Sequence, residues 1–313
     1  MKNKITIVFF LTFLSINTIK AQEKANWINS VFWEISGKNI KSSYVFGTHH
    51  LYSPEFIQKN PVIMERLHKV DIVVGEMALD SNQFKQMGKM MNAMTLKDKT
   101  LKDFLSEKEF QDTDKLMKDL MGIPLAFFTK MKPIVIYQYI TIGKYLKSEN
   151  KEPSSMLGKM PESMDILFQE EGRKSKKEIL GLESIEQQMA VLYDGYSLER
   201  QVEMLKEIVY DTKKQNKEEK NEVDEVQKLT NMYKSQDINE MEQITQKEST
   251  KEEYDNLLKN RNINWIPQIT TIIKNKKTAF IAVGAAHLGG EFGVLNLLKK
   301  EGYTIKPLTI KIN

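Results

Sequence analysis

The segment Thr278-Ala-Phe-Ile-Ala-Val-Gly284-Ala-Ala-His287 is an apolar run that ends at a glycine, with a histidine three positions later. The same pattern occurs near the other end of the chain, in Ser43-Tyr-Val-Phe-Gly47-Thr-His-His50. Short runs of β-branched and aromatic residues that end at a turn residue are typical of buried strands. Ligands gather at the carboxyl ends of parallel strands, because the loops leaving them surround one crevice. We therefore expect an α/β fold in which the two Gly-x-x-His turns meet, with each glycine allowing a sharp turn and a close backbone approach.

Two further apolar runs end on carboxylates. Asp71-Ile-Val-Val-Gly75 leads to Glu76, and Glu178-Ile-Leu-Gly-Leu182 leads to Glu183. Two imidazoles and a carboxylate from strand ends form a plausible metal site or acid/base site. A divalent cation held there would activate water for hydrolysis near neutral pH. Manganese, cobalt, zinc and iron all accept such ligands, so the identity of the metal stays open.

The middle of the chain has a different character. Residues 79–177 read as long amphipathic helices with many methionines and few strand signals. We predict a central mixed or mostly parallel sheet with a large helical insertion, in a single domain that spans residues 22–313. Met87, Met90, Met91 and Met94 form an apolar helix face, which we interpret as an adaptable core stripe, with a substrate-binding lip as the alternative.

The first 21 residues have the pattern of a secretory signal peptide. Lys2 and Lys4 precede an apolar run, and Ala21 is a small residue at the expected cleavage position. The apolar run is short for an uncleaved membrane anchor, which is the competing interpretation. We expect export to the periplasm or the extracellular space, and no membrane span after cleavage.

Composition excludes several classes of function. The chain has 46 Lys and Arg against 42 Asp and Glu, and removal of Lys2, Lys4 and Lys20 leaves 43 against 42, a net charge of +1. A nearly neutral protein gives no argument for nucleic-acid binding. The absence of cysteine rules out thiol catalysis and disulfides, and there is no Gly-x-Ser-x-Gly motif of a serine hydrolase and no phosphate-binding glycine loop.

Five blocks of sequence, in order, resemble the TraB/GumN (TraB/PrgY/GumN) family, which includes the Tiki metalloproteases. The blocks are Tyr44-Val-Phe-Gly47-Thr-His-His50, Val73-Val-Gly-Glu76, Gly181-Leu-Glu-Ser-Ile-Glu-Gln-Gln188, Arg261-Asn262 with Trp265, and Ala282-Val-Gly-Ala-Ala-His-Leu-Gly289. The resemblance implies an EreA/ChaN-like α/β core and a divalent-metal-dependent hydrolase site. Proteolysis is associated with the Tiki branch, so the resemblance supports the site more than the substrate.

The resemblance also implies roles for individual residues. His50 and His287 would be metal ligands, and Glu76 would be either a ligand or the general base. Glu183 would be a further acidic member of the site, and Arg261 with Asn262 would stabilise charge or orient ligands.

Some of these residues have structural alternatives. Glu183 is as readily explained as a cap of the helix that begins near Ser184, and Arg261 as a structural ion-pair partner of the acids. His49 is able to take the place of His50, whereas His68 is interpreted as a surface residue. Asp165 and Gln188 match positions of the family blocks, and we interpret both as structural.

Two functions from different classes follow. The first is a secreted metal-dependent hydrolase, with a peptidase as one form of it, that acts on a peptide or small-molecule substrate. The second is a non-catalytic exported protein that binds haem, metal or peptide in the same crevice. Convergence of the two histidines with a carboxylate would favour the first.

Overall fold

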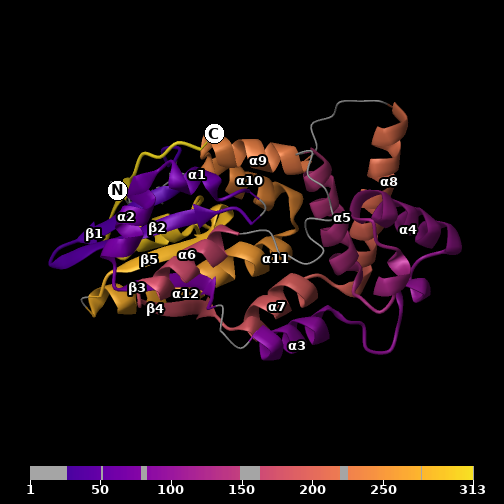
Figure 1. The fold of residues 1–313 in the computed structure, drawn as a ribbon, viewed down its shortest axis with the longest axis horizontal. Helices are drawn as coiled ribbons and strands as arrows, with labels where there is room; N and C mark the ends of the chain where they lie inside the picture. Colours follow the sequence, from indigo (N-terminus) through magenta and orange to yellow (C-terminus); the bar gives the residue numbers. More distant parts are fainter. Residues whose placement is uncertain are drawn as a thin grey trace, which may run out of the picture.

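A computed structural model describes residues 27–50, 52–78, 83–148, 163–218, 225–275 and 277–312. The predicted signal peptide, residues 1–21, lies outside these ranges. In the described part, a sheet with helices on both faces is joined to a group of helices on one side of it (Figure 1). No helix of the described residues is long and apolar enough to cross a membrane.

The sheet has six strands in the order β4-β3-β5-β2-β1-β6. Its four neighbouring strands β4 (Glu178–Glu183), β3 (Ile72–Met77), β5 (Ala279–Gly284) and β2 (Ile40–Thr48) are parallel. The strand β1 (Phe32–Gly37) is antiparallel to both β2 and β6 (Thr304–Pro307). This arrangement confirms the α/β class and the mixed sheet that the sequence predicts.

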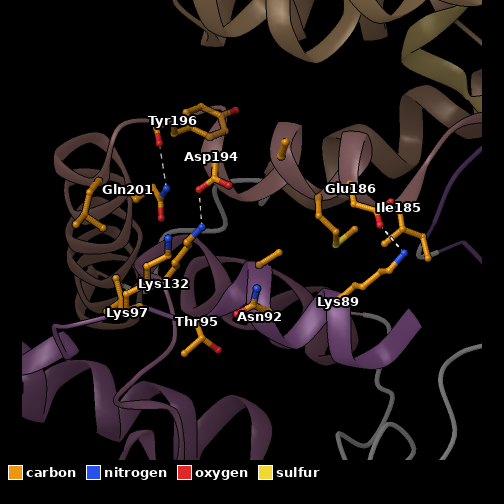
Figure 2. A pocket seen from close by; sticks show the side chains of 15 residues that line it. Lys89, Asn92, Thr95, Lys97, Lys132, Ile185, Glu186, Asp194, Tyr196 and Gln201 are labelled. Atoms are coloured by element: carbon orange, nitrogen blue, oxygen red, sulfur yellow. Dashed lines mark hydrogen bonds and ion pairs between the residues drawn. The ribbon is translucent and has the colours of Figure 1, made fainter. Parts of the chain in front are cut away.

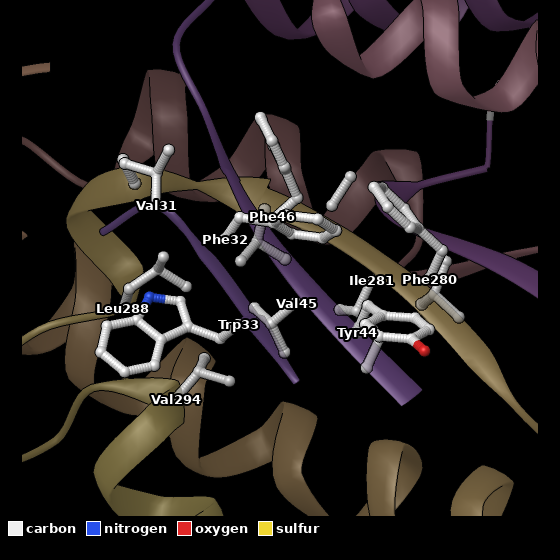
Figure 3. Close-up of a cluster of buried hydrophobic side chains, with 14 of the residues drawn as sticks. Val31, Phe32, Trp33, Tyr44, Val45, Phe46, Phe280, Ile281, Leu288 and Val294 are labelled. Atoms are coloured by element: carbon white, nitrogen blue, oxygen red, sulfur yellow. The ribbon is translucent and has the colours of Figure 1, made fainter. Parts of the chain in front are cut away.

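Alternating side chains of the central strands build the main apolar core, which extends over both faces of the sheet. On one face the rings of Phe46 and Phe280 are 6.2 Å apart and both contact Phe168 of α6 (Met164–Lys174). On the other face lie Val45, Ile281 and Val294, the first residue of α13 (Val294–Lys300) (Figure 3). Because both faces are covered, the strands are continuous apolar runs, as is usual for parallel sheets.

The helices that cover the sheet come from distant parts of the chain. The short α1 (Glu55–Gln58), α2 (Pro61–Lys69) and α6 lie over one face, and α12 (Asn260–Lys274) and α13 over the other. The chain segment between α8 (Leu198–Glu218) and α12 contains α9 (Glu225–Ser235), α10 (Ile238–Glu248) and α11 (Lys251–Tyr254). The carboxyl ends of the parallel strands are therefore surrounded by elements from both halves of the sequence.

A second apolar core lies among the helices beside the sheet. It is built by α4 (Glu107–Met121), α5 (Pro133–Ser148) and α8 (Leu198–Glu218), with the single-turn helices η1 (Leu101–Asp103) and η2 (Leu125–Phe128) at its margin. A third cluster joins α5 to α3 (Gln83–Met94) and α7 (Ile185–Asp194). The methionine face of α3 is divided: Met90 and Met94 pack against this cluster, whereas Met87 and Met91 are exposed.

Candidate functional site

The strand register brings the two Gly-x-x-His turns together. In the parallel pair β2 and β5, Thr48 lies opposite Gly284, so the two segments that follow these strands leave the sheet at the same level. Gly75 lies opposite Ala282 on the other side of β5, and Met77 opposite Glu183 in β4. Four strand ends, two that contain a predicted site residue and two that are followed by one, thus surround one small region.

Glu76 lies inside β3, which continues to Met77, rather than after the strand as the sequence suggests. Its side chain is buried, and its carboxylate accepts hydrogen bonds from the Gly284 amide at 2.8 Å, Gln188 Nε2 at 2.9 Å and Arg261 Nη2 at 2.7 Å. Burial by itself raises the pKa of Glu76, but the charges and donors around it lower that pKa to about 2. The group is therefore held as a carboxylate, which suits a ligand better than a general base.

Arg261 is the cation at the centre of this region. Its guanidinium forms a two-pronged ion pair with Glu183, with Nε 2.8 Å from Oε1 and Nη2 3.0 Å from Oε2. The indole N–H of Trp265 donates to the same Glu183 oxygen at 2.9 Å, and the guanidinium lies over the Trp265 ring. Glu183 does not cap the next helix, because the side chains of Ser184 and Gln187 form that capping box. The prediction that Arg261 forms ion pairs with the acids is thus confirmed. Through these ion pairs Arg261 contacts the predicted site residues Glu76 and Glu183.

The helix that carries Arg261 begins with an irregular turn. The π-helix η4 (Asp255–Lys259) lies between α11 and α12, and the Leu257 carbonyl in it accepts a hydrogen bond from Arg261 Nη1 at 3.2 Å. A π turn shifts the register of the residues after it, and such turns are frequent at functional sites. Here Arg261, Asn262 and Trp265 all point toward the strand ends.

His287 is buried in the single-turn helix η5 (Ala285–His287), with 5% of the residue exposed. Its Nδ1 is 2.7 Å from Asn262 Oδ1, and the Asn262 amide donates to the carbonyls of His287 and Phe292. The asparagine oxygen is therefore the acceptor, so the proton of the imidazole is on Nδ1 and its lone pair is on Nε2. Burial lowers the pKa of His287 to about 3, which keeps the ring neutral at physiological pH.

His50 has a different environment. Its side chain is 68% exposed, and its Nδ1 is 3.2 Å from Asp165 Oδ2 at the beginning of α6. The other Asp165 oxygen accepts a hydrogen bond from Thr48 at 3.0 Å. The hydrogen bond to Asp165 raises the pKa of His50 to about 9. His50 is close enough to Glu76 and His287 for its charge to affect their ionisation.

His49 faces another part of the protein. Its Nδ1 accepts a hydrogen bond from the Tyr52 amide at 3.2 Å, and its ring packs near Tyr52 and Tyr233. Burial lowers the pKa of His49 to about 4. Since His49 belongs to this aromatic cluster, His50 is the histidine of the pair that contacts Asp165 and whose charge acts on Glu76 and His287. His68 is exposed, 3.9 Å from Glu171, in agreement with a surface role.

Neither motif glycine has an unusual backbone conformation, and Gly47 is required for space. Among the described residues, the glycines with positive φ are Gly122, Gly290 and Gly302, so neither motif glycine uses the left-handed backbone conformation. A Cβ at Gly47 would lie 2.8 Å from Leu288 Cδ1 and 3.0 Å from the Ala285 backbone. The glycine therefore lets the β2 strand end approach the His287 turn closely.

The donor chemistry of the site fits a divalent cation. Two ligand atoms that are each about 2.1 Å from one ion lie at most about 4.2 Å apart. His287 Nε2 and Glu76 Oε1 are 3.9 Å apart, within that limit. Among the described residues, no three His, Cys, Asp or Glu side chains are grouped closely enough to hold a metal as they stand. For His50 to act as a third ligand, its side chain would have to move. The His50 side chain is exposed, which leaves space for such a movement.

A separate cavity of about 590 Å³ lies on the helical side of the molecule, between α3, α7 and the first turns of α5 and α8 (Figure 2). Ion pairs between Lys89 and Glu186 and between Lys132 and Asp194 lie along it. Helix α7 separates this cavity from the strand ends, because Glu186 and Met189 line the cavity while Gln188 donates to Glu76. The cavity thus contains none of the predicted site residues.

A model of the TraB/PrgY/gumN family matches residues 31–307, nearly the whole chain. The protein belongs to the TraB/PrgY/gumN family. No curated protein and no solved structure matches it. Membership of the TraB/PrgY/gumN family confirms the resemblance seen in the sequence, whereas the metal and catalytic roles of its individual residues stay predictions.

Two further residues contact the predicted site residues. Asp165, which the sequence suggests is structural, contacts His50, and Gln188, with the same expectation, donates a hydrogen bond to Glu76. Gln188 is five residues after Glu183, on the helix that follows the strand, which is a usable signal. Asp165 lies far from His50 in sequence, next to residues with no strand pattern, and only the packing of α6 connects them.

Proposed function

We propose that this protein is an exported metal-dependent hydrolase in which His50, His287 and Glu76 hold a divalent ion. The observation that carries the proposal is the orientation of the two histidines. Each ring uses Nδ1 to contact an oxygen acceptor, Asn262 for His287 and Asp165 for His50. This leaves Nε2 of each ring as the coordinating nitrogen, an arrangement that metal-binding histidines usually have.

A divalent ion in this position would polarise a substrate carbonyl and lower the pKa of a water molecule. The residues of the chain have separate tasks. Asn262 fixes the orientation and the proton position of His287, and the Gly284 amide and Gln188 orient Glu76. Arg261 supplies a buried positive charge beside the region where negative charge would develop on a substrate.

The chemical class of the substrate follows from the hydrolase proposal: a peptide or a small molecule with a carbonyl group. The predicted export suits a substrate outside the cytoplasm. The separate cavity lies on the opposite face of α7 from Gln188 and is not part of this proposed site.

The test is the metal content of the purified protein, determined by elemental mass spectrometry, for the wild type and for His50→Ala and His287→Ala. His68→Ala is the matched control, because His68 is also paired with a carboxylate but lies at the surface. We expect near-stoichiometric metal in the wild type and the control, and loss of metal in the other two variants. Equal metal content in all four proteins, or none after reloading, would contradict the proposal.

A second candidate function is binding without catalysis, and the cavity between α3 and α7 favours it. Its volume of about 590 Å³ is in the usual range for small-molecule sites, about 300–1,000 Å³. Its walls combine apolar side chains such as Met189 with lysines. Binding of a small molecule that is abolished by Ala190→Trp but not by His287→Ala would support this function over the first.

A further inference from the structure

Arg261 occupies the face of His287 that a metal ion would need. Arg261 Nη1 is 3.1 Å from His287 Nε2, and Nη2 is 2.7 Å from Glu76 Oε2. Only 9% of the arginine side chain is exposed. The guanidinium therefore lies against two of the three groups to which we assign metal binding.

The direction of the Arg261–His287 hydrogen bond is determined by the partners of both residues. The Asn262 oxygen accepts from Nδ1 of His287, so Nε2 carries the lone pair. An arginine side chain can only donate. Arg261 Nη1 thus donates to the lone pair of His287 Nε2, which is the pair of electrons that would coordinate an ion.

The rest of the guanidinium is held independently of His287. Nε and Nη2 make the paired hydrogen bonds to Glu183, Trp265 supports Glu183, and the ring of Trp265 lies beneath the guanidinium, with its centroid 4.9 Å from the central carbon. Paired Arg–carboxylate contacts are strong and fix the plane of the guanidinium. Release of the His287 contact would therefore leave Arg261 anchored on Glu183.

We propose that Arg261 is an internal competitor for the metal: it takes the lone pair of His287 in the metal-free protein and gives it up when a divalent ion binds. This inference rests on the proposed metal site. One lone pair cannot serve a guanidinium N–H and a metal ion together, so metal binding includes the loss of the Arg261–His287 hydrogen bond. The repulsion between the guanidinium and the ion also lowers metal affinity.

The consequence is a trade between stability and metal affinity. With Arg261 in place, Glu76 and Glu183 share a buried countercharge, and the folded protein does not depend on metal. Without it, two carboxylates and one neutral imidazole would lie together with no countercharge, which is a stronger divalent-cation site. Removal of the arginine is therefore expected to weaken the metal-free fold and to strengthen metal binding.

The experiment measures Zn²⁺ affinity by competition with a chromophoric chelator, and unfolding by urea with and without Zn²⁺, for the wild type and Arg261→Gln. We expect at least tenfold tighter Zn²⁺ binding in Arg261→Gln, and a stabilisation by Zn²⁺ that is larger than in the wild type. Arg200→Gln is the matched control, because Arg200 also pairs with glutamates but lies on α8, on the helical side of the molecule.

A second variant allows for misfolding of the first. In the double variant Arg261→Gln/Glu183→Gln, a cation and an anion are removed together, so the net charge of the buried group is unchanged. It still lacks the guanidinium at His287, and we expect Zn²⁺ binding at least tenfold tighter than in the wild type. The visible absorption of bound Co²⁺ provides a second readout of coordination.

The outcomes separate this inference from the proposed function. Metal binding by the wild type that is lost in His287→Ala but unchanged or weaker in both Arg261 variants overturns the inference and leaves the proposed function standing. Binding by the Arg261 variants alone supports the competitor and overturns the metalloenzyme. No binding by any of these proteins overturns both.

Discussion

The two Gly-x-x-His turns have the same short pattern and leave neighbouring strands in register, yet they differ in what covers them. His287 lies under α12, between Asn262 and Arg261, and is buried. His50 contacts Asp165 on α6 and remains largely exposed. The comparison teaches that the motif places the imidazole at the strand end, while the packing of a distant helix determines whether the ring is rigid and neutral or exposed and protonated.

The largest expected difference between the two turns concerns their carboxylate partners. Glu76→Ala removes a buried carboxylate and leaves Arg261 short of one countercharge, which typically costs about 3–5 kcal/mol. Asp165→Ala removes a partly exposed hydrogen-bond acceptor and is expected to cost about 1 kcal/mol. Urea unfolding followed by tryptophan fluorescence measures both. Similar losses of unfolding free energy for the two variants would mean that the turns are equally coupled to the fold.

The two glycines offer a smaller test of the same comparison. Gly47→Ala would press a methyl group against Leu288 and Ala285, so we expect a loss of about 1–3 kcal/mol in unfolding free energy. A methyl group at Gly284 would lie 3.3 Å from Glu76 Oε1, and the backbone there, with φ −53° and ψ 137°, is accessible to alanine. Gly284→Ala is expected to cost less than about 1 kcal/mol. Thermal and urea unfolding measure both variants. A larger loss of unfolding free energy for Gly284→Ala than for Gly47→Ala would mean that backbone conformation, rather than space, selects glycine.

A change of pH is expected to have opposite effects on stability through the two histidines. The folded-state pKa of His287 lies below the unfolded value, so its contribution is complete above pH 6.5 and is lost as the pH falls toward 3. Metal-free protein should lose about 1–2 kcal/mol of unfolding free energy between pH 6.5 and pH 5 through this residue. Urea unfolding at these two pH values, in the wild type and His287→Gln, measures the contribution.

The folded-state pKa of His50 is raised instead. Its stabilising contribution is present below pH 6.5 and is lost as the pH rises through about 9. Because the side chain is largely exposed, solvent screens this pair and the effect on stability is small. NMR titration of the imidazole signals should show His50 titrating near pH 9 and His287 not titrating near neutrality. A normal pKa for both rings would remove the distinction.

Much of the fold was predictable because its signals are local. The apolar runs before Gly47, Gly75 and Gly284 predict strands, and the carboxylates and histidines after them predict a site at the strand ends. The structure places all of these runs in the parallel part of the sheet. The strand at Glu76 continues two residues farther than predicted, because Glu76 and Met77 still pair or pack within the sheet, and no local pattern indicates this.

The insertion of β5 between β2 and β3 was not predictable from pattern alone. Strand order depends on which long-range pairings form, and the sequence of one strand is compatible with several neighbours. The same limit applies to Arg261. Its position in the sequence shows a charged residue near a tryptophan, but the π turn before it and the location of Glu183 determine that it reaches His287.

By itself, the sequence determined the fold class, the family and the residue types at the strand ends, because these depend on short motifs and hydrophobic periodicity. Only the tertiary structure decided which histidine of the His49–His50 pair contacts Asp165, how deeply each imidazole is buried, and which cation contacts the lone pair of His287. Burial, ionisation and hydrogen-bond direction depend on atoms that distant segments bring together. They therefore depend on the packing of α6 and α12 against the strand ends, which no single segment of the chain specifies.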